Sequence, residues 1–316
     1  MRPFLTIRIL ALLLTTGVLA GAAPGPTAPP PRLRVVRGVT ATGEATPQWL
    51  AILRRRLSDS TYAAVAGLRK PLTAAERAWA ELIESRIAGW EREIPAIAAP
   101  FAPVAPPPAV TIVLGNRGAH DGFTHDPVTI GHDLSALQRE YGDASDPGNR
   151  ERLDRFFRHE FTHLMQKAWR PTHPYAMDSP LRLALAEMWA EGLGNYYSLA
   201  DNWRSVGGRP SERTRSTLAI LEPRVVARLA ALACTTPERA RALTADLSWG
   251  RFDRKWGAVA PALWLELDGD RPDSAYRRLV EEGPDGIWSL AERHLTPELA
   301  ATLREARVAD SLCAGH

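Results

Sequence analysis

The chain has 316 residues, of which 45% are apolar and 24% are charged. These fractions are typical of a soluble globular protein and exclude collagen-like, low-complexity and intrinsically disordered chains. The formal net charge is +3, and it becomes +1 if the two arginines of the first 23 residues are removed with that segment. Because proteins that bind nucleic acid through its phosphates keep a basic excess, we expect no nucleic-acid partner.

Residues 1–23 have the pattern of a secretory signal peptide. Arg2 and Arg8 form a basic start, residues 9–20 form a mostly apolar run, and residues 20–22 are small. The alternative is a membrane anchor, but the run is much shorter than the about 20 residues that span a bilayer. We therefore expect a protein exported to the periplasm or extracellular medium of a bacterium, with no stable membrane anchor after signal cleavage.

The chain contains two cysteines, Cys234 and Cys313. In an oxidising compartment they would form a disulfide that ties the C-terminal tail to the body, and the alternative is two separate buried thiols. Neither belongs to a Cys-x-x-Cys pair, so the sequence does not indicate a thiolate zinc site or a redox motif.

The chain divides into the signal segment 1–23, a proline-rich tether at 24–46, an N-terminal helical segment at 47–108 and a larger domain at 109–316. Five prolines in residues 24–31 favour an extended tether. Apolar residues at helical spacing predict two or three helices between residues 47 and 97. Short β-branched runs at 110–114 and 128–131 predict two strands, which a loop containing Gly and His joins.

Two further helices follow these strands. The first is expected after residues 146–148 and ends near Trp169, before Pro171. The second is expected from Ser179, as N-cap, and Pro180 to about residue 199. Residues 211–312 are again helical in period. The predicted fold class is α+β and mainly α-helical, with a small sheet before the first of these helices and a helical C-terminal subdomain.

An H-E-x-x-H motif, residues 159–163, lies inside the first of these helices. Its spacing places His159 and His163 on one helix face, where both imidazoles can bind one cation, and it places Glu160 beside them. Two imidazoles leave a zinc ion short of the third protein ligand that catalytic sites use. A metzincin would need Gly and His at the positions of Gln166 and Trp169, so that class is excluded.

A carboxylate from the next helix is the other standard third ligand, and Glu191 lies there in the segment W-A-E-G-L-G-N-Y, residues 189–196. The two motifs together resemble those of the gluzincin metallopeptidases, whose second motif is typically W-x-x-E-G-x-A-x-Y. The resemblance implies that His159, His163 and Glu191 bind one zinc ion and that Glu160 is the catalytic general base. Two departures are that Trp189 lies one residue nearer to the glutamate and that Gly194 replaces alanine.

Glu187 is the rival third ligand, because it lies one turn before Glu191 on nearly the same face. We favour Glu191, since Gly192 beside it would let two helix backbones approach closely around a metal. Asn195, one turn after Glu191, would either orient a histidine ligand through its outer nitrogen or be an ordinary surface residue.

The ligand set predicts peptide-bond hydrolysis, in which a zinc-bound water is activated by Glu160. A donor beside zinc must stabilise the oxyanion, and the residues that could supply it are His173, Tyr175, Tyr196, Tyr197, Tyr276 and His294. The predicted strand 128–131 is a candidate rail on which an extended peptide or protein substrate would pair by β-augmentation.

Two other groups of charged residues invite interpretation. Three histidines and three aspartates lie close together in the chain: His120, His125, His132, Asp121, Asp126 and Asp133. They could form a second metal site, but we favour the interpretation that they are solvated loop residues. The run Arg54 to Arg56 is expected to be a solvated helix face.

The sequence therefore predicts an exported zinc-dependent hydrolase, a metallopeptidase of gluzincin type in residues 109–316. The alternative is a non-catalytic exported helical binding or scaffold protein that retains a metal site. Glu160 disfavours this alternative, because a purely structural zinc site has no use for a carboxylate that does not bind the metal.

Overall fold

The computed structural model describes residues 31–118, 120–268 and 272–313. The predicted signal peptide lies outside these residues, as does most of the proline run after it. The strands are β1 (Arg32–Arg37), β2 (Ala109–Gly115), β3 (Gly122–Asp126) and β4 (Thr129–Asp133). The helices are α1 (Pro47–Arg56), α2 (Asp59–Ala66), α3 (Ala74–Ala98), α4 (Leu134–Tyr141), α5 (Pro147–Trp169), α6 (Pro180–Ser198), α7 (Glu212–Leu232), α8 (Pro237–Thr244), α9 (Trp256–Leu267), α10 (Pro272–Glu282), α11 (Gly286–His294) and α12 (Pro297–Cys313). The predicted fold class, α+β and mainly α-helical, is confirmed.

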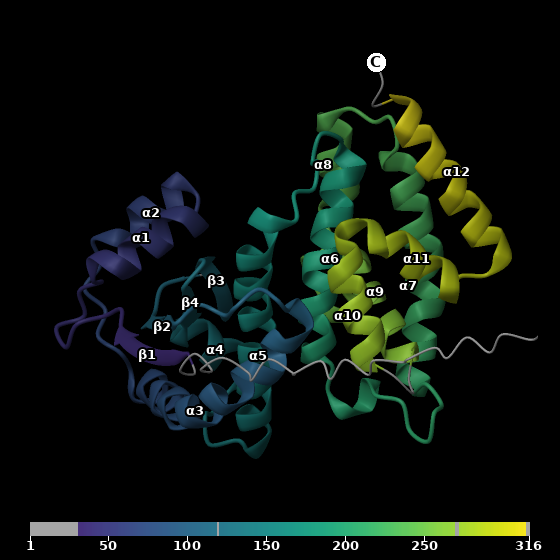
Figure 1. Cartoon of the computed structure of the whole chain (residues 1–316). Helices are drawn as coiled ribbons and strands as arrows, with labels where there is room; N and C mark the ends of the chain where they lie inside the picture. Colours follow the sequence, from purple (N-terminus) through teal and green to yellow (C-terminus); the bar gives the residue numbers. More distant parts are fainter. Residues whose placement is uncertain (1–30, 119, 269–271, 314–316) are drawn as a thin grey trace, which may run out of the picture.

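The molecule has two halves that meet along α5 and α6 (Figure 1). The sheet and α1 to α5 form one half, and α6 to α12 form the other. Within the described residues, no helix combines the length and the apolar character that crossing a membrane requires. Helix α6 starts as predicted, and the Ser179 side chain caps it by accepting a hydrogen bond from the Arg182 N–H at 3.2 Å. Helix α5 starts at Pro147, two residues earlier than predicted.

The sheet has the order β1-β2-β4-β3, in which β1, β2 and β4 are parallel and β3 is antiparallel to β4. Two of its strands were not expected. Residues 32–37, which the sequence pattern places in the tether, form β1, and the predicted loop between the other two strands contains β3. Both are edge strands with several polar residues, and their partners lie on other segments, so local periodicity carries little signal for them.

Glycine allows β3 to lie close against β4. A Cβ atom on Gly131 of β4 would come within 2.3 Å of the Phe123 ring, which packs across the strand pair. The Phe123 ring in turn stacks on Trp49 of α1 with 6.2 Å between ring centroids. This stacking packs the first helix against the edge strand.

The predicted N-terminal helical segment packs onto α5 through α3. The Trp90 and Phe157 rings stack with their planes 1° apart and their centroids 4.7 Å apart. The Trp90 Nε1–H donates to Asp154 at 2.7 Å, and Arg86 donates twice to the same carboxylate at 2.9 Å. One buried apolar core runs through α3, the sheet, α5 and the helices of the second half.

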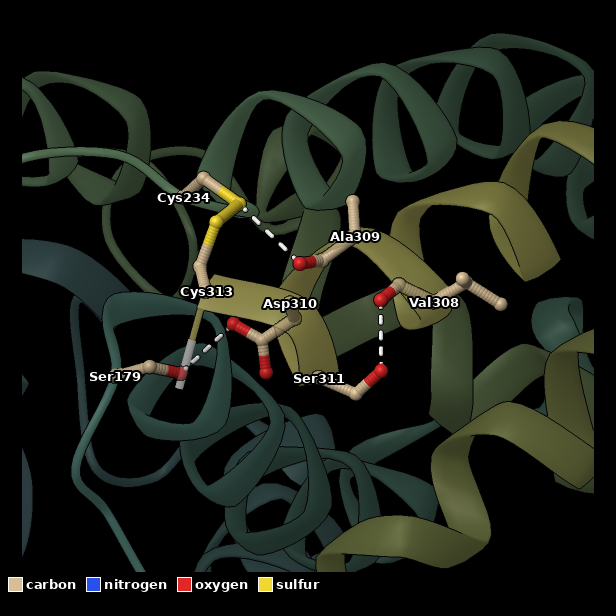
Figure 2. Close-up of a disulfide and its surroundings, with 7 residues drawn as sticks. All are labelled: Ser179, Cys234, Val308, Ala309, Asp310, Ser311 and Cys313. Atoms are coloured by element: carbon tan, nitrogen blue, oxygen red, sulfur yellow. Dashed lines mark hydrogen bonds between the residues drawn. A yellow bond between two sulfur atoms is a disulfide. The ribbon is translucent and has the colours of Figure 1, made fainter. Parts of the chain in front are cut away.

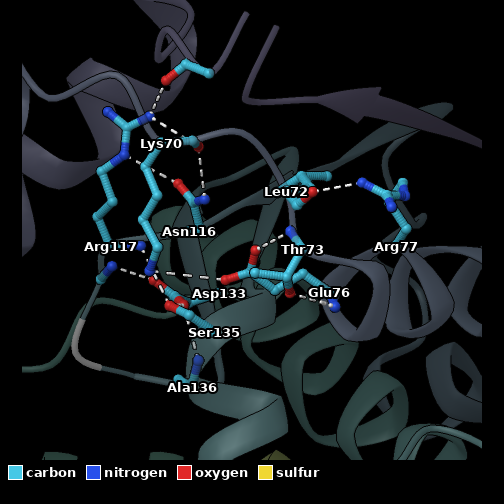
Figure 3. Close-up of polar contacts among 12 residues, drawn as sticks. Lys70, Leu72, Thr73, Glu76, Arg77, Asn116, Arg117, Asp133, Ser135 and Ala136 are labelled. Carbon is cyan, nitrogen blue, oxygen red and sulfur yellow. Dashed lines mark hydrogen bonds and ion pairs between the residues drawn. The ribbon is translucent and has the colours of Figure 1, made fainter. Parts of the chain in front are cut away.

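A buried polar network fixes the loop between α2 and α3 over the end of the sheet (Figure 3). Arg117, whose φ is +73°, donates to the Leu68 carbonyl at 2.7 Å and to the Gly43 carbonyl, while the Asn116 side chain donates to the Lys70 carbonyl at 3.1 Å. Because buried carbonyls without a partner are costly, this network holds α1 and α2 at a defined place beside the cleft described below.

Cys234 and Cys313 form a disulfide with 5.6 Å between their Cα atoms, which confirms the first of the two interpretations (Figure 2). The bond joins the end of α12 to the residue pair that follows α7. Nearby, the Ser179 hydroxyl at the start of α6 donates to Asp310 of α12 at 3.0 Å. The C-terminal helix is therefore attached to both α7 and α6.

Replacing both cysteines by serine is expected to lower the free energy of unfolding by about 2–4 kcal/mol, because the cross-link restricts the unfolded chain. The metal centre described below involves neither residue, so metal binding should be unchanged. Urea unfolding of the double variant and of wild type, each with and without a reductant, measures the effect. A wild-type protein that loses no stability on reduction would contradict the prediction.

Candidate metal centre

Helix α5 presents its two histidines side by side at the boundary with α6. Its opposite face is anchored by buried apolar residues, which include Leu153, Phe157 and Phe161. The His159 and His163 rings lie edge to face with centroids 4.7 Å apart, and their Nε2 atoms are 3.0 Å apart. Two ring nitrogens directed at one point are the arrangement that a shared cation would require.

Helix α6 folds back along α5 and brings Glu191 to the two histidines. Trp169 and Trp189, with ring centroids 5.2 Å apart, pack the two helices together at one end. The carboxylate oxygens of Glu191 lie 3.5 Å from His163 Nε2 and 3.8 Å from His159 Nε2. Two ligand atoms on a tetrahedral zinc ion lie about 3.3 Å apart, given metal–ligand distances of about 2.0–2.1 Å. The three side chains therefore fit a zinc ion, and they form the group of metal-capable residues found among the described residues.

The rival ligand is not part of this group. Glu187 lies at the edge of the cleft, where its carboxylate accepts a hydrogen bond from the Ser248 hydroxyl. The reason for preferring Glu191 was nevertheless wrong. A Cβ on Gly192 would meet Pro261 of α9 at 2.6 Å, whereas it is a Cβ on Gly194 that would meet the His159 ring at 3.0 Å.

Each imidazole is oriented by a partner at its outer nitrogen. The Gln166 amide donates to the Ala190 carbonyl at 3.0 Å, so its oxygen faces His163 Nδ1 at 2.8 Å and accepts the proton there. His163 Nε2 is then left with a lone pair that faces the cluster. His159 Nδ1 lies 3.1 Å from the Ser198 hydroxyl. Such partners hold a histidine ligand in one tautomer and one orientation.

Asn195 orients the glutamate and not a histidine. Its side chain is buried and donates to the Glu191 carbonyl at 2.9 Å and to the Glu191 carboxylate at 3.2 Å. Both interpretations offered for Asn195 are therefore corrected. The sequence signal that was missed is the i, i+4 spacing, which allows a direct side-chain contact on a helix.

The charge states suit a metal ion. Burial, followed by the neighbouring His163, lowers the pKa of His159 below its ordinary value. Burial alone would raise the pKa of Glu191, but the two imidazoles, Lys255 and the Asn195 hydrogen bond lower it on balance. A neutral imidazole and an ionised carboxylate are the forms that coordinate a metal.

Glu160 lies outside the group of three and is held by the edge strand. Its carboxylate is buried, and Oε2 accepts a hydrogen bond from the Thr124 hydroxyl of β3 at 2.8 Å. No group among the described residues donates to its other oxygen, Oε1. The result is an oriented carboxylate beside the histidines with one free oxygen. Thr124 was missed in the sequence because β3 was not recognised.

These groups open into a cleft of about 1130 Å³ between the two halves of the molecule. The β3 side of the cleft includes Asp121, Gly122, Phe123 and Thr124. The predicted substrate rail, residues 128–131, is wrong in its position, because β4 is paired on both sides and cannot accept another chain. Of the two edge strands, β1 and β3, it is β3 that lines the cleft, and its outer side can accept another chain.

None of the six residues considered for oxyanion stabilisation is among the described residues that line the cleft. His173, for example, stacks on Trp169 with ring centroids 3.9 Å apart, and His294 lies 3.1 Å from Asp268. Cationic residues line the cleft instead, and Arg56 and Lys255 are two of them. The prediction that Arg56 lies on a solvated helix face is wrong, because α1 ends beside the cleft. The Arg56 guanidinium lies 4.2 Å from the centroid of the Phe123 ring.

The histidines and aspartates of residues 120–133 form no second group of metal ligands within the described residues. His132 departs from the expected solvated loop: it lies buried on β4, with Nδ1 3.2 Å from the Asp121 carbonyl. Burial lowers the pKa of His132, so the ring is neutral. The ring packs against Gly122 of β3, which lines the cleft.

The fold and the site define a mainly helical α+β protein with a His-His-Glu group that can hold a metal ion. No protein-family model matches the chain, and no curated protein or solved structure is significantly similar to it. The likeness to the gluzincins is therefore a likeness of two short motifs, and the function below is proposed from the site.

Replacing Gln166 by leucine is expected to weaken zinc binding by about 10–100-fold, because His163 loses the acceptor that fixes its tautomer. Competition with a chromophoric chelator measures the affinity. Gln138→Leu, on the exposed side of α4, is the matched control and should bind zinc as wild type does. Equal zinc affinity of both variants would show that Gln166 does not orient the ligand.

Proposed function

We propose that this protein is a zinc-dependent hydrolase that cleaves peptide bonds. The observation that carries the proposal is the position of Glu160, an oriented and buried carboxylate that is next to the His-His-Glu group but not part of it. A structural metal site has no use for such a group, whereas a hydrolase needs a base at this place.

His159, His163 and Glu191 would hold the ion, and nitrogen and carboxylate ligands of this kind suit zinc. Three protein ligands leave further coordination positions open, as catalytic sites do. When bound, zinc supplies a Lewis acid that polarises a carbonyl group and makes a water molecule more acidic.

Glu160 performs the proton transfers. Thr124 occupies Oε2, so Oε1 is the atom that accepts a proton from the attacking water and then returns it to the leaving amine. Gln166, Ser198 and Asn195 keep the three ligand side chains in place throughout.

A peptide is the substrate that best fits the surroundings. The free edge of β3 runs along the cleft, and its main-chain groups can pair with an extended chain beside Glu160. The predicted signal peptide and the Cys234–Cys313 disulfide together support export to an oxidising compartment.

The test is to purify the mature protein, measure its metal content and incubate it with a peptide library of mixed sequence. We expect about one zinc ion per chain, cleavage that a chelator abolishes, and recovery on adding zinc. Bound zinc without cleavage would support the alternative of a non-catalytic exported binding or scaffold protein. A protein that binds no zinc, or that binds iron in its place, would overturn the proposal.

A further inference from the structure

Basic side chains line the cleft along α5 on both sides of the histidines. Arg152 and Arg155 lie within two turns before the first histidine, and Lys167 and Arg170 lie within two turns after the second. All four line the cleft. Their spacing keeps them on the helix face that carries the metal ligands.

These charges are largely unpaired. Lys167 Nζ reaches a backbone carbonyl at 3.5 Å, Arg170 reaches a methionine sulfur at 3.4 Å, and Arg152 lies 4.5 Å from the centroid of a tyrosine ring. Arg155 has a carboxylate within 4 Å, that of Glu151 at 3.7 Å, but this glutamate side chain is 74% exposed. An ion pair of that kind contributes little, so the helix presents net positive charge to the cleft.

Within the part of the chain that the structure describes, three more cationic residues, Arg56, Arg213 and Lys255, line the other walls of the cleft. Arg56 lies over the Phe123 ring, and its Nε is buried without a hydrogen-bond partner among the described residues. Lys255, just before α9, lines the opposite side, and within the described residues it has no ion pair. The strand side, the floor and the helical side of the cleft are therefore all basic.

The basic residues of the cleft outnumber its acidic ones, because seven Arg and Lys side chains among the described residues line it against four carboxylates. Of the four, Glu191 belongs to the metal-capable group, and each of the other three accepts a hydrogen bond from a neighbouring hydroxyl. The chain as a whole carries a net charge of only +3, so its composition does not explain a cleft so rich in positive charge. Low-dielectric walls strengthen the field that such a cluster directs at a ligand.

We propose that the cleft selects acidic peptides, with carboxylate side chains on both sides of the bond that faces the metal centre. Guanidinium and ammonium groups recognise carboxylates by charge and hydrogen bonding, and the two basic pairs, one within α5 and one at its C-terminal end, lie on opposite sides of the histidines. This inference rests on the proposed peptidase function only for the cleavage step. A measurement of peptide binding therefore tests the selection of acidic peptides separately from the peptidase activity.

The experiment measures equilibrium binding of fluorescent peptides to the zinc-loaded Glu160→Gln variant, which is not expected to turn them over. Three peptides of equal length differ only in whether Glu, Gln or Lys occupies the flanking positions. We expect the Glu peptide to bind about 10–100-fold more tightly than the Gln peptide, with the Lys peptide weakest. The preference should shrink as salt is raised. Equal binding of the Glu and Gln peptides would overturn the proposal.

Substitutions identify the cations responsible. In the same background, Lys167→Gln and Arg170→Gln should each weaken binding of the Glu peptide by about 3–10-fold and leave the Gln peptide unaffected. The matched control is Arg139→Gln, an exposed cation on α4 outside the cleft, which should change neither. If the variant that carries both Lys167→Gln and Arg170→Gln retains its zinc and still prefers the Glu peptide as strongly as before, the inference is wrong. Selective binding without hydrolysis by wild type would support the inference and overturn the peptidase function.

Discussion

Glu160→Gln is expected to lower kcat/KM for peptide hydrolysis by about 10²–10⁴-fold, while the purified variant keeps its zinc. The amide has the size of the carboxylate and can still accept the hydrogen bond from Thr124, so the site should stay intact. It cannot accept a proton from water at neutral pH. Kinetics with a quenched fluorescent peptide and elemental analysis of the same sample give both quantities.

The matched control for this change is Glu81→Gln, an exposed position on α3 away from the cleft. It should leave both kcat/KM and zinc content as in wild type. Undiminished hydrolysis by Glu160→Gln would remove Glu160 from the mechanism. Loss of zinc together with activity would show that Glu160 is a ligand and not a base.

Glu191→Ala is expected to weaken zinc binding by more than about 100-fold. This loss is larger than the one expected from removing a residue, such as Gln166, that only hydrogen-bonds to a ligand. The reason is geometric, because the Glu191 oxygens lie 3.5 Å and 3.8 Å from the two Nε2 atoms that define the site. Only the two imidazoles would remain, and catalytic zinc sites use three protein ligands. Zinc per chain after dialysis, together with chelator competition, measures the loss, and hydrolysis should fall in parallel.

Glu187→Ala is the natural control, because it removes the same side chain one turn earlier on the same helix. Its carboxylate accepts a hydrogen bond from Ser248 and does not belong to the metal group, so zinc content should be unchanged. The opposite result, with zinc lost in Glu187→Ala and kept in Glu191→Ala, would exchange the roles of the two residues. If both variants keep zinc, the third ligand lies elsewhere.

Much of α5 and α6 could be predicted because the signals are local. Pro147, Ser179 and Pro180 mark helix starts within a few residues of where they act, and the i, i+4 spacing of His159 and His163 holds in any α-helix. The motif helix and its neighbour therefore have the predicted positions in the chain.

Other parts of the fold carry no comparable local signal. Strand β1 pairs with β2, whose residues lie more than 70 positions away, and β3 contains polar residues that do not alternate clearly with apolar ones. The missed strand also made the prediction of the site incomplete. Because β3 was not recognised, Thr124 was overlooked and the substrate edge was placed on β4.

The amino-acid pattern alone is sufficient to predict the neighbouring pair of histidines, the glutamate between them in the chain and a short set of candidates for the third member of the group. The sequence already favoured Glu191 over Glu187, but the place of Glu191 beside both histidines, its partner Asn195, the partners Gln166 and Ser198, and the basic cleft became visible only once the helices were packed. Helical periodicity relates residues three or four positions apart, whereas these contacts join segments whose distance and orientation depend on the packing of the whole core. Arg56 shows the difference most clearly, because its sequence neighbours suggest a solvated helix face and its spatial neighbours make it part of the cleft wall.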